Sequence, residues 1–193
     1  MVKGTEGKIS AAVRVLRAGG VIVFPTDTAY GIGCDATDSR AVARVFRLKG
    51  RERGKAMPMI VSDLHMAKEH FRISDIELRI SKRHWPGPLS LVLNAKRGIA
   101  PAALIAGTAA VRVPHSRIAR SLARRLGRPI IATSANRSGL PPAYSTRQLT
   151  VTADYVLNAG ALPRRKPSTI ARVRPDGTVE VLRAGPVSVA STP

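Results

Sequence analysis

A chain of 193 residues, 44% of them apolar, is long enough for one domain with a sizeable core and is too apolar for a disordered tail. No apolar run of about 18 residues indicates a membrane span. The first residues do not resemble a signal peptide, and Cys34 alone supports neither an internal disulfide nor a zinc site. We therefore expect a cytoplasmic protein.

Charge is the strongest feature of the composition. The 32 Lys and Arg residues against 12 Asp and Glu give a formal charge of +20, and arginine supplies most of the cations. Arginine pairs bidentately with phosphate, so a polyanionic partner is expected, and nucleic acid is the natural one. Because only 4% of the residues are aromatic, we expect recognition of phosphate and shape rather than base stacking. A generally basic proteome or a solubility requirement is the alternative explanation.

The chain opens with the pattern of an α/β fold. Apolar residues recur at helical spacing over residues 8–18, and residues 21–24 then form an apolar strand that ends at Pro25. Hydroxyl and carboxyl side chains follow the proline, and Gly31 and Gly33 allow the backbone to approach a ligand or another strand. This stretch predicts a buried strand that delivers polar groups to a site.

The later segments continue the alternation of helices and strands. Asp38 and Ser39 provide a polar cap for the second helix, and residues 175–177 form a turn that predicts a hairpin between the last two strands. The remaining elements are predicted as helices at residues 41–48, 74–85 and 116–127, and as strands at residues 57–61, 89–93, 109–114, 155–157, 168–173 and 179–183, with a further strand beginning at residue 129.

Polar turns follow two of the predicted strands. Residues 133–139 have the same pattern as residues 25–33, because in both an apolar strand is followed by small polar residues and glycine. In open α/β sheets, ligands bind in the crevice at the strand ends, so we expect the two turns to converge. Arg112 lies near the exit of a third strand, where it could serve the same site or be a solvated edge residue.

Three basic segments stand out. Residues 49–55 hold four cations on a glycine-containing loop after a helix, where the helix dipole explains some of them and a bound phosphate explains the set better. The outward face of the helix at residues 116–127 carries or adjoins Arg117, Arg120, Arg124, Arg125 and Arg128, and residues 164–166 form a basic loop. These rows are a candidate nucleic-acid face or a solvated surface.

The polar inventory at the predicted strand ends suits phosphate and carboxylate binding. The sequence lacks the signatures of zinc proteases, Rossmann folds and P-loops, and it has no evident Ser/His/acid set. Such an inventory catalyses by positioning and electrostatics, without a covalent nucleophile. Its members are the hydroxyls of Thr26, Thr28, Ser134 and Ser168, the amide of Asn136, and the cations of Lys49, Arg51, Lys55, Arg112 and Arg183.

The motifs in this order closely resemble the YrdC/Sua5 family. The resemblance covers nearly the whole chain, and its lysine-x-arginine and serine-x-asparagine pair is specific. The matching segments are Pro25-Thr26-Asp27-Thr28-Ala29-Tyr30-Gly31, Lys49-Gly50-Arg51, Trp85-Pro86-Gly87-Pro88-Leu89-Ser90, Val111-Arg112-Val113-Pro114 and Ser134-Ala135-Asn136-Arg137-Ser138-Gly139.

The resemblance implies a fold and an activity. The fold would be a single-domain, twisted, open mixed sheet with flanking helices and a ligand cleft at the strand ends, formed by residues 1–185 and followed by a tail at residues 186–193. The activity would be that of a short-form L-threonylcarbamoyladenylate synthase, a nucleotidyltransferase. It would join L-threonine, bicarbonate and ATP, release pyrophosphate, and begin the synthesis of N6-threonylcarbamoyladenosine at position 37 of tRNA. Proteins that transfer the threonylcarbamoyl group to tRNA would act downstream.

The resemblance also implies roles for individual residues. Thr28, Arg112 and Ser168 would hold threonine, with Arg112 on its carboxylate. The ATP side would be lined by Arg51, Lys55, Thr108, Ser134 and Arg183. Lys49, Arg51, Ser134 and Asn136 would form the catalytic set, with Mg²⁺ on the phosphates. The chain departs from the common family pattern at Glu52, Ala56, Ser62 and Pro142.

Two other functions compete with this interpretation. The high charge and the arginine rows would also suit a non-catalytic protein that binds double-stranded RNA or tRNA. A carbamoyladenylate-forming relative inside a larger maturation factor is the other alternative, although no accompanying domains are present in this sequence.

Overall fold

The computed structural model describes residues 3–52 and 57–189, so the predicted nucleotide contact of Lys55 lies outside the described residues. The α-helices of the described residues are α1 (Lys3–Arg17), α2 (Ser39–Lys49), α3 (Leu64–His70), α4 (Asp75–His84) and α5 (Arg117–Leu126). The strands are β1 (Ile22–Pro25), β2 (Tyr30–Gly33), β3 (Met59–Ile60), β4 (Phe71–Arg72), β5 (Leu89–Ala95), β6 (Thr108–Arg112), β7 (Ile130–Ile131), β8 (Thr133–Ser134), β9 (Tyr155–Val156), β10 (Thr169–Val173) and β11 (Val179–Arg183).

The strands form two hydrogen-bonded sheets that lie next to each other. One has the order β8-β2-β1-β9, and the other has the order β11-β10-β5-β6-β3-β7, with β4 paired to β5. Both sheets are mixed: β1 and β9, β3 and β6, and β5 and β10 run parallel, whereas the other pairs run antiparallel. An isolated bridge between Asp35 and Ile130 connects the chain after β2 with β7. The expected mixed α/β architecture is therefore confirmed.

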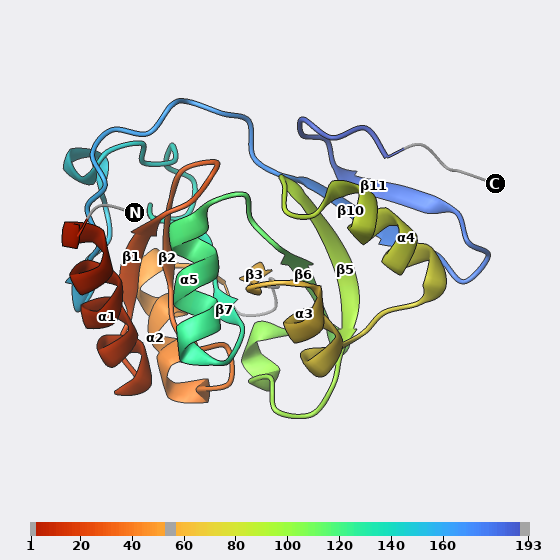
Figure 1. Ribbon diagram of the computed structural model, residues 1–193, viewed down its shortest axis with the longest axis horizontal. Helices are drawn as coiled ribbons and strands as arrows, with labels where there is room; N and C mark the ends of the chain where they lie inside the picture. The colour runs from red at the N-terminus through yellow and green to blue at the C-terminus, as the bar shows by residue number, and fades with distance from the viewer. Residues whose placement is uncertain (1–2, 53–56, 190–193) are drawn as a thin grey trace.

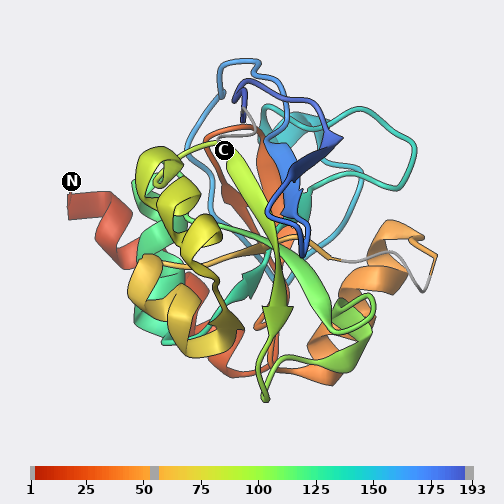
Figure 2. The same ribbon diagram turned by 90° about the vertical axis from the view of Figure 1, so that its right-hand side faces the viewer.

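Helices cover both faces of this arrangement. Helices α1 and α5 lie side by side over β1 (Figure 1), and α2 lies on the opposite side of the sheets from α1, α3, α4 and α5 (Figure 2). Local signals fix the helix ends. Asp38 Oδ1 accepts hydrogen bonds from the backbone amides of Arg40 and Ala41 in the first turn of α2. Ser74 and Glu77 form a capping box on α4, and Gly127 ends α5 with a left-handed φ of 77°.

The core lies between the helices and the sheets. Phe24, Tyr30, Met59 and Leu91 are fully or almost fully buried and belong to the same apolar cluster as the inner faces of α1, α2 and α5. Gly33 shows how closely the two sheets approach, because a Cβ at this position would lie 1.7 Å from the carbonyl oxygen of Ile131. The prediction that a glycine here allows another strand to come close is confirmed.

A long connection joins the two sheets. Residues 157–168 leave β9 in the first sheet and cross the top of the molecule in Figure 1 to enter β10 in the second. The Tyr30 hydroxyl donates a hydrogen bond to the carbonyl of Gly160 at 2.7 Å, which ties this connection to β2. The hairpin of β10 and β11 follows this connection. The ends of the strands, the connection and the hairpin together surround a common space.

Within the described residues, no helix has the length and apolarity required to cross a membrane. Cys34 is buried, and burial raises the pKa of its thiol, which makes it an unreactive core residue.

Candidate active site

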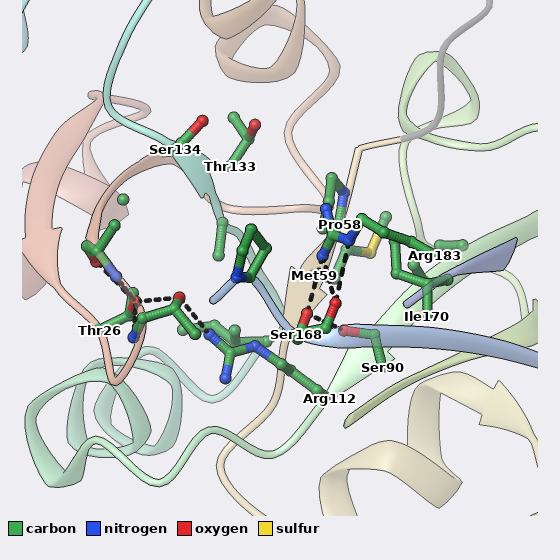
Figure 3. A pocket seen from close by; sticks show the side chains of 18 of the residues that line it. Thr26, Pro58, Met59, Ser90, Arg112, Thr133, Ser134, Ser168, Ile170 and Arg183 are labelled. Carbon is green, nitrogen blue, oxygen red and sulfur yellow. Dashed lines mark hydrogen bonds between the residues drawn. The ribbon is translucent and has the colours of Figure 1, made fainter. Parts of the chain in front are cut away.

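A cavity of about 450 Å³ lies where the two sheets meet. Its walls come from strands of both sheets, from the turns after β1 and β8, from the connection before β10, and from β11. Figure 3 shows Thr26 on one side of the cavity and Ser90, Ser168 and Arg183 on the other, with Arg112 between them. The expected convergence of the two polar turns is confirmed, because Thr28 and Ser134 line the same space.

Arg112 occupies the floor between the threonine side chains and the serine side chains. It stands at the end of β6, and its side chain is 9% exposed. Its Nη1 donates to both carboxylate oxygens of Asp27, at 2.7 and 2.9 Å, and its Nη2 lies 3.5 Å from Thr28 Oγ1. The Thr28 hydroxyl in turn lies 3.1 Å from that of Thr26. This corner combines a fixed cation with hydroxyls, which is suited to a small hydroxylated carboxylate.

A second polar group joins Ser90, Ser168 and Arg183. The hydroxyls of Ser90 and Ser168 lie 3.1 Å apart, and Arg183 donates from Nη2 to Ser168 Oγ at 3.0 Å and to the Ser168 carbonyl at 2.8 Å. Burial lowers the pKa of Arg183, and the nearby charge of Arg112 adds to that effect. Arg112 and Arg183 therefore line a common space, and an anion bound there would stabilise the charged forms of both.

A smaller hollow of about 300 Å³ adjoins the main cavity and shares Arg51 and Ser134 with it. Lys49 and Asn136 also line it. Lys49 belongs to the last turn of α2 rather than to the basic loop expected from the sequence, because the helix continues to Lys49 and is capped by Gly50, whose φ is 56°.

Lys49 is buried, and its ammonium serves the backbone of the polar turn. Nζ donates to the carbonyl of Ser134 at 2.5 Å and to that of Asn136 at 2.6 Å. Burial lowers the pKa of Lys49 to about 8, with a further contribution from the charge of Arg51. Burial also lowers the pKa of Arg51. Lys49 thus joins the lysine-x-arginine segment to the serine-x-asparagine (SxN) turn through two hydrogen bonds. It also places a positive charge beside the hollow.

The structure brings the sequence-predicted residues together. Among the predicted positions that it describes, the main cavity is lined by Thr28, Arg51, Thr108, Arg112, Ser134, Ser168 and Arg183, and the smaller hollow is lined by Lys49, Arg51, Ser134 and Asn136. The Thr108 hydroxyl, however, is engaged by the carbonyl of Ile105 at 2.8 Å. Pro142, a departure from the family pattern, lines the main cavity, whereas Ser62 is turned to Asp63 and Met66.

Sequence reasoning missed four residues at this site. Asp27 and Ser90 fall inside the quoted motifs but were given no role, and Arg165 and Arg172 line the cavity from outside those motifs. Asp27 lies in the bend between β1 and β2, so the alternation of a strand could not assign the direction of its side chain, and its place in the quoted motif was the available signal. The sequence marked Arg165 as part of the basic loop at residues 164–166, but its place at the cavity depends on the path of the connection between the sheets.

Several arginines of the candidate nucleic-acid face have partners within the protein. Arg125 forms an ion pair with Glu6 on α1, Arg128 pairs with the buried Asp35 at 2.8 Å, and Arg124 lies 3.8 Å from Asp63. Arg120 is half-buried. This face therefore contributes to packing as well as to surface charge.

The donor set of the hollow can be compared with what Mg²⁺ requires. No group of three or more His, Cys, Asp or Glu residues placed to hold a metal exists among residues 3–52 and 57–189. Asn136 nevertheless has a buried Oδ1 without a hydrogen-bond partner, while its Nδ2 donates to two backbone carbonyls. A single amide oxygen in a hollow that Lys49 and Arg51 also line fits an ion that takes most of its ligands from water and from a bound anion.

Comparisons with known proteins agree on one family. The Sua5/YciO/YrdC family model, described as "Telomere recombination", matches residues 14–185. A threonylcarbamoyl-AMP synthase from Thiobacillus denitrificans is 38% identical over 186 residues, which cover 93% of this chain and 96% of that protein.

Solved structures have the same fold. Sua5 of Pyrococcus abyssi, complexed with L-threonine, is 31% identical with a TM-score of 0.85, and the match covers 93% of this chain and 54% of Sua5. This chain thus spans about half the length of that relative. YciO of E. coli is 29% identical with a TM-score of 0.83 over 95% of this chain and 91% of YciO.

Proposed function

This chain belongs to the Sua5/YciO/YrdC family, and we propose that it is an L-threonylcarbamoyladenylate synthase. The observation that carries the proposal is one cavity lined by Arg112, Thr28 and Ser168 and also by Arg51, Ser134 and Arg183. The first three provide a cation and hydroxyls for an amino acid, and the second three provide cations and a hydroxyl for a nucleotide. Relatives that share most of the chain are threonylcarbamoyl-AMP synthases.

Threonine would bind at the Arg112 corner. A guanidinium can hold the carboxylate with two parallel hydrogen bonds, and the hydroxyls of Thr28 and Ser168, which line the same cavity, would complete the set. Apolar side chains such as Met59 and Ile60 line the same cavity and would receive the methyl group. Valine lacks the hydroxyl and serine lacks the methyl. A missing methyl in an apolar pocket typically changes specificity by about 10 to 200-fold.

The proposed reaction has two steps. The threonine amine first attacks carbon dioxide or bicarbonate to form a carbamate and loses a proton, which passes to solvent when carbon dioxide is the donor and leaves as part of water when bicarbonate is the donor. A carbamate oxygen then attacks the α-phosphorus of ATP, the bond to the β-phosphate breaks, and pyrophosphate leaves with the released charge. No protein nucleophile takes part, so the residues contribute by orienting the two substrates and by stabilising phosphate charge.

The residues around the smaller hollow would stabilise the departing pyrophosphate. Arg51 lines both spaces, and Lys49 holds the Ser134 and Asn136 carbonyls in place with its charge beside the hollow. We propose Mg²⁺ as the accompanying ion, with Asn136 Oδ1 as a protein ligand. When bound, the ion would neutralise part of the charge on the phosphates.

The remaining partners follow from the same proposal. We propose that the product feeds the modification of tRNA to N6-threonylcarbamoyladenosine through downstream transfer proteins, in the cytoplasm where ATP, threonine and tRNA meet. We also propose residues 1–185 as the catalytic domain. The basic segments at residues 164–166 and on the exposed part of α5 are the candidates for direct tRNA contact.

Pyrophosphate release tests the proposal. The purified protein is given ATP, Mg²⁺, bicarbonate and either L-threonine, L-serine or L-valine. We expect release that depends on both bicarbonate and the amino acid, and that is highest with L-threonine. Equal rates with all three amino acids, or release that ignores bicarbonate, would contradict the assignment.

A further inference from the structure

Asp27 binds the guanidinium of Arg112 from a position outside the cavity lining. Its two carboxylate oxygens accept hydrogen bonds from Nη1 at 2.7 and 2.9 Å, and one of them also accepts from the backbone N–H of His115 at 3.1 Å. The two side chains are only 6% and 9% exposed. Arg112 lines the main cavity, whereas Asp27 does not. The carboxylate therefore influences the cavity through the arginine rather than by touching its contents.

The other charges of the wall make this arrangement distinctive. Arg51, Arg112, Arg165, Arg172 and Arg183 line the cavity, and no aspartate or glutamate of the described residues does so. Arg165, Arg172 and Arg183 make no salt bridge with a described residue, whereas Arg112 makes a buried one with a chelating carboxylate. An anion entering the cavity thus meets several cations, of which Arg112 is already paired with a carboxylate.

We propose that Asp27 is a positioning residue that sorts the anions of the two substrates. It adapts Arg112 to a singly charged carboxylate and leaves the phosphates of the nucleotide to the other arginines. This inference deepens the proposed function and rests on it for the identity of the carboxylate.

The sorting follows from geometry and charge together. Because Asp27 occupies Nη1, the described residues leave Arg112 Nε without a hydrogen-bond partner and give Nη2 only the 3.5 Å contact with Thr28. One edge of the guanidinium is thus available to a planar, bidentate ligand. Repulsion by the Asp27 charge grows with the charge of the incoming anion, so a phosphate dianion is disfavoured about twice as strongly as a carboxylate.

Sorting would have a direct consequence for catalysis. Without it, a phosphate of ATP could occupy the Arg112 corner, exclude threonine and leave the α-phosphorus in the wrong place. When Asp27 disfavours phosphate at Arg112, ATP binds in one preferred position and the Arg112 corner stays open to the amino acid.

The unaltered protein provides the first test. Binding of L-threonine and of inorganic phosphate is measured by isothermal titration calorimetry, alone and in competition. We expect phosphate to compete with ATP and to leave the affinity for threonine unchanged. Displacement of threonine by phosphate in the parent protein would overturn the proposal, and this outcome needs no variant to fold.

The variant Asp27→Asn provides the second test. Loss of the charge should raise the ratio of phosphate affinity to threonine affinity by about tenfold or more, and phosphate should then compete with threonine. The added phosphate binding should disappear when Arg112→Ala is combined with Asp27→Asn. An unchanged ratio, or added phosphate binding that persists without Arg112, would overturn the proposal.

A matched control separates sorting from a general change of charge. Asp35 is also a buried carboxylate paired with an arginine, Arg128, but neither residue lines the cavity. Asp35→Asn should leave the ratio unchanged, and an equal shift in both variants would refute the role of Asp27. If the parent protein binds no threonine, the proposed function fails, while the Arg112-dependent gain in phosphate binding still tests the sorting itself.

Discussion

The clamp formed by Lys49 allows fold stability and activity to be separated in one variant. Its ammonium donates to the carbonyls of Ser134 and Asn136, and the residue is 2% exposed. Lys49→Met keeps the length and apolar body of the side chain but removes the charge and both hydrogen bonds. Because the SxN turn stays linked to the rest of β8 and the core, we expect the variant to fold.

The expected change in stability is small because two effects oppose each other. A pKa lowered to about 8 means that burial, together with the charge of Arg51, disfavours the charged lysine by about 3 kcal/mol, at about 1.4 kcal/mol for each pKa unit. Hydrogen bonds from a charged donor contribute about 1.5 to 3 kcal/mol each. Their loss is partly offset by relief of the burial penalty, so the free energy of unfolding should fall by no more than about 3 kcal/mol.

Activity should respond much more strongly than stability. Loss of an electrostatic stabiliser beside the departing phosphates should lower the rate of threonine-dependent pyrophosphate release by about 10² or more. The assay compares this rate with the free energy of unfolding from urea denaturation of the same preparations.

Lys96→Met is the matched control, because Lys96 also donates to a backbone carbonyl, that of Lys68, but at an exposed position outside the cavity. The control should keep the parental rate. A Lys49→Met rate within about threefold of the parent would refute the assigned charge role. A loss of folding would refute the estimate of opposing effects.

Three further predictions concern threonine, pH and RNA. Arg112→Ala should raise the KM for L-threonine with a smaller effect on the KM for ATP, and unchanged threonine dependence in steady-state kinetics would contradict its role as the carboxylate partner. The value of kcat/KM for ATP should decline as pH rises through about 8, because the buried Lys49 loses its proton there. The same limb should lie at higher pH for Lys49→Arg, and an unshifted limb would assign it to another group. Replacing Arg120, Arg124 and Arg125 with glutamine should weaken tRNA binding and its salt dependence in filter-binding measurements while pyrophosphate release is retained, and parental tRNA affinity would return this helix face to a structural role.

Local signals made most of the fold predictable. Asp38 before α2, Ser74 before α4 and Gly127 after α5 mark helix ends through short-range hydrogen bonds or a left-handed backbone, and the Pro175-Asp176-Gly177 turn marks the final hairpin. Such features depend on a few neighbouring residues, so the sequence displays them directly.

Elements that depend on distant partners were not predicted. The strand β2 contains Gly31 and Gly33, which lower strand propensity, yet pairing with β1 and β8 makes it a strand. The short elements α3 and β4 offer too few residues for a clear period, and β4 exists because Phe71 and Arg72 pair with β5. For β2 and β4, pairing with other strands overrides a weak local preference.

The candidate site also has a part that the sequence predicts and a part that depends on distant contacts. The motifs predicted which side chains gather, since Thr28, Arg112 and Ser168 do line one cavity. They did not predict what those side chains contact within the protein. The pairing of Arg112 with Asp27 and the attachment of Lys49 to two carbonyls both join segments more than 80 residues apart in the sequence.

Isotopic labelling of the product tests the central claim most directly. The protein is incubated with ATP, Mg²⁺, L-threonine and ¹³C-bicarbonate, and the nucleotide products are identified by mass spectrometry. The account predicts an adenylate that contains threonine and one ¹³C atom, formed in equal amount to pyrophosphate. Formation of threonyl-adenylate without the label, or of pyrophosphate with unmodified AMP alone, would contradict it.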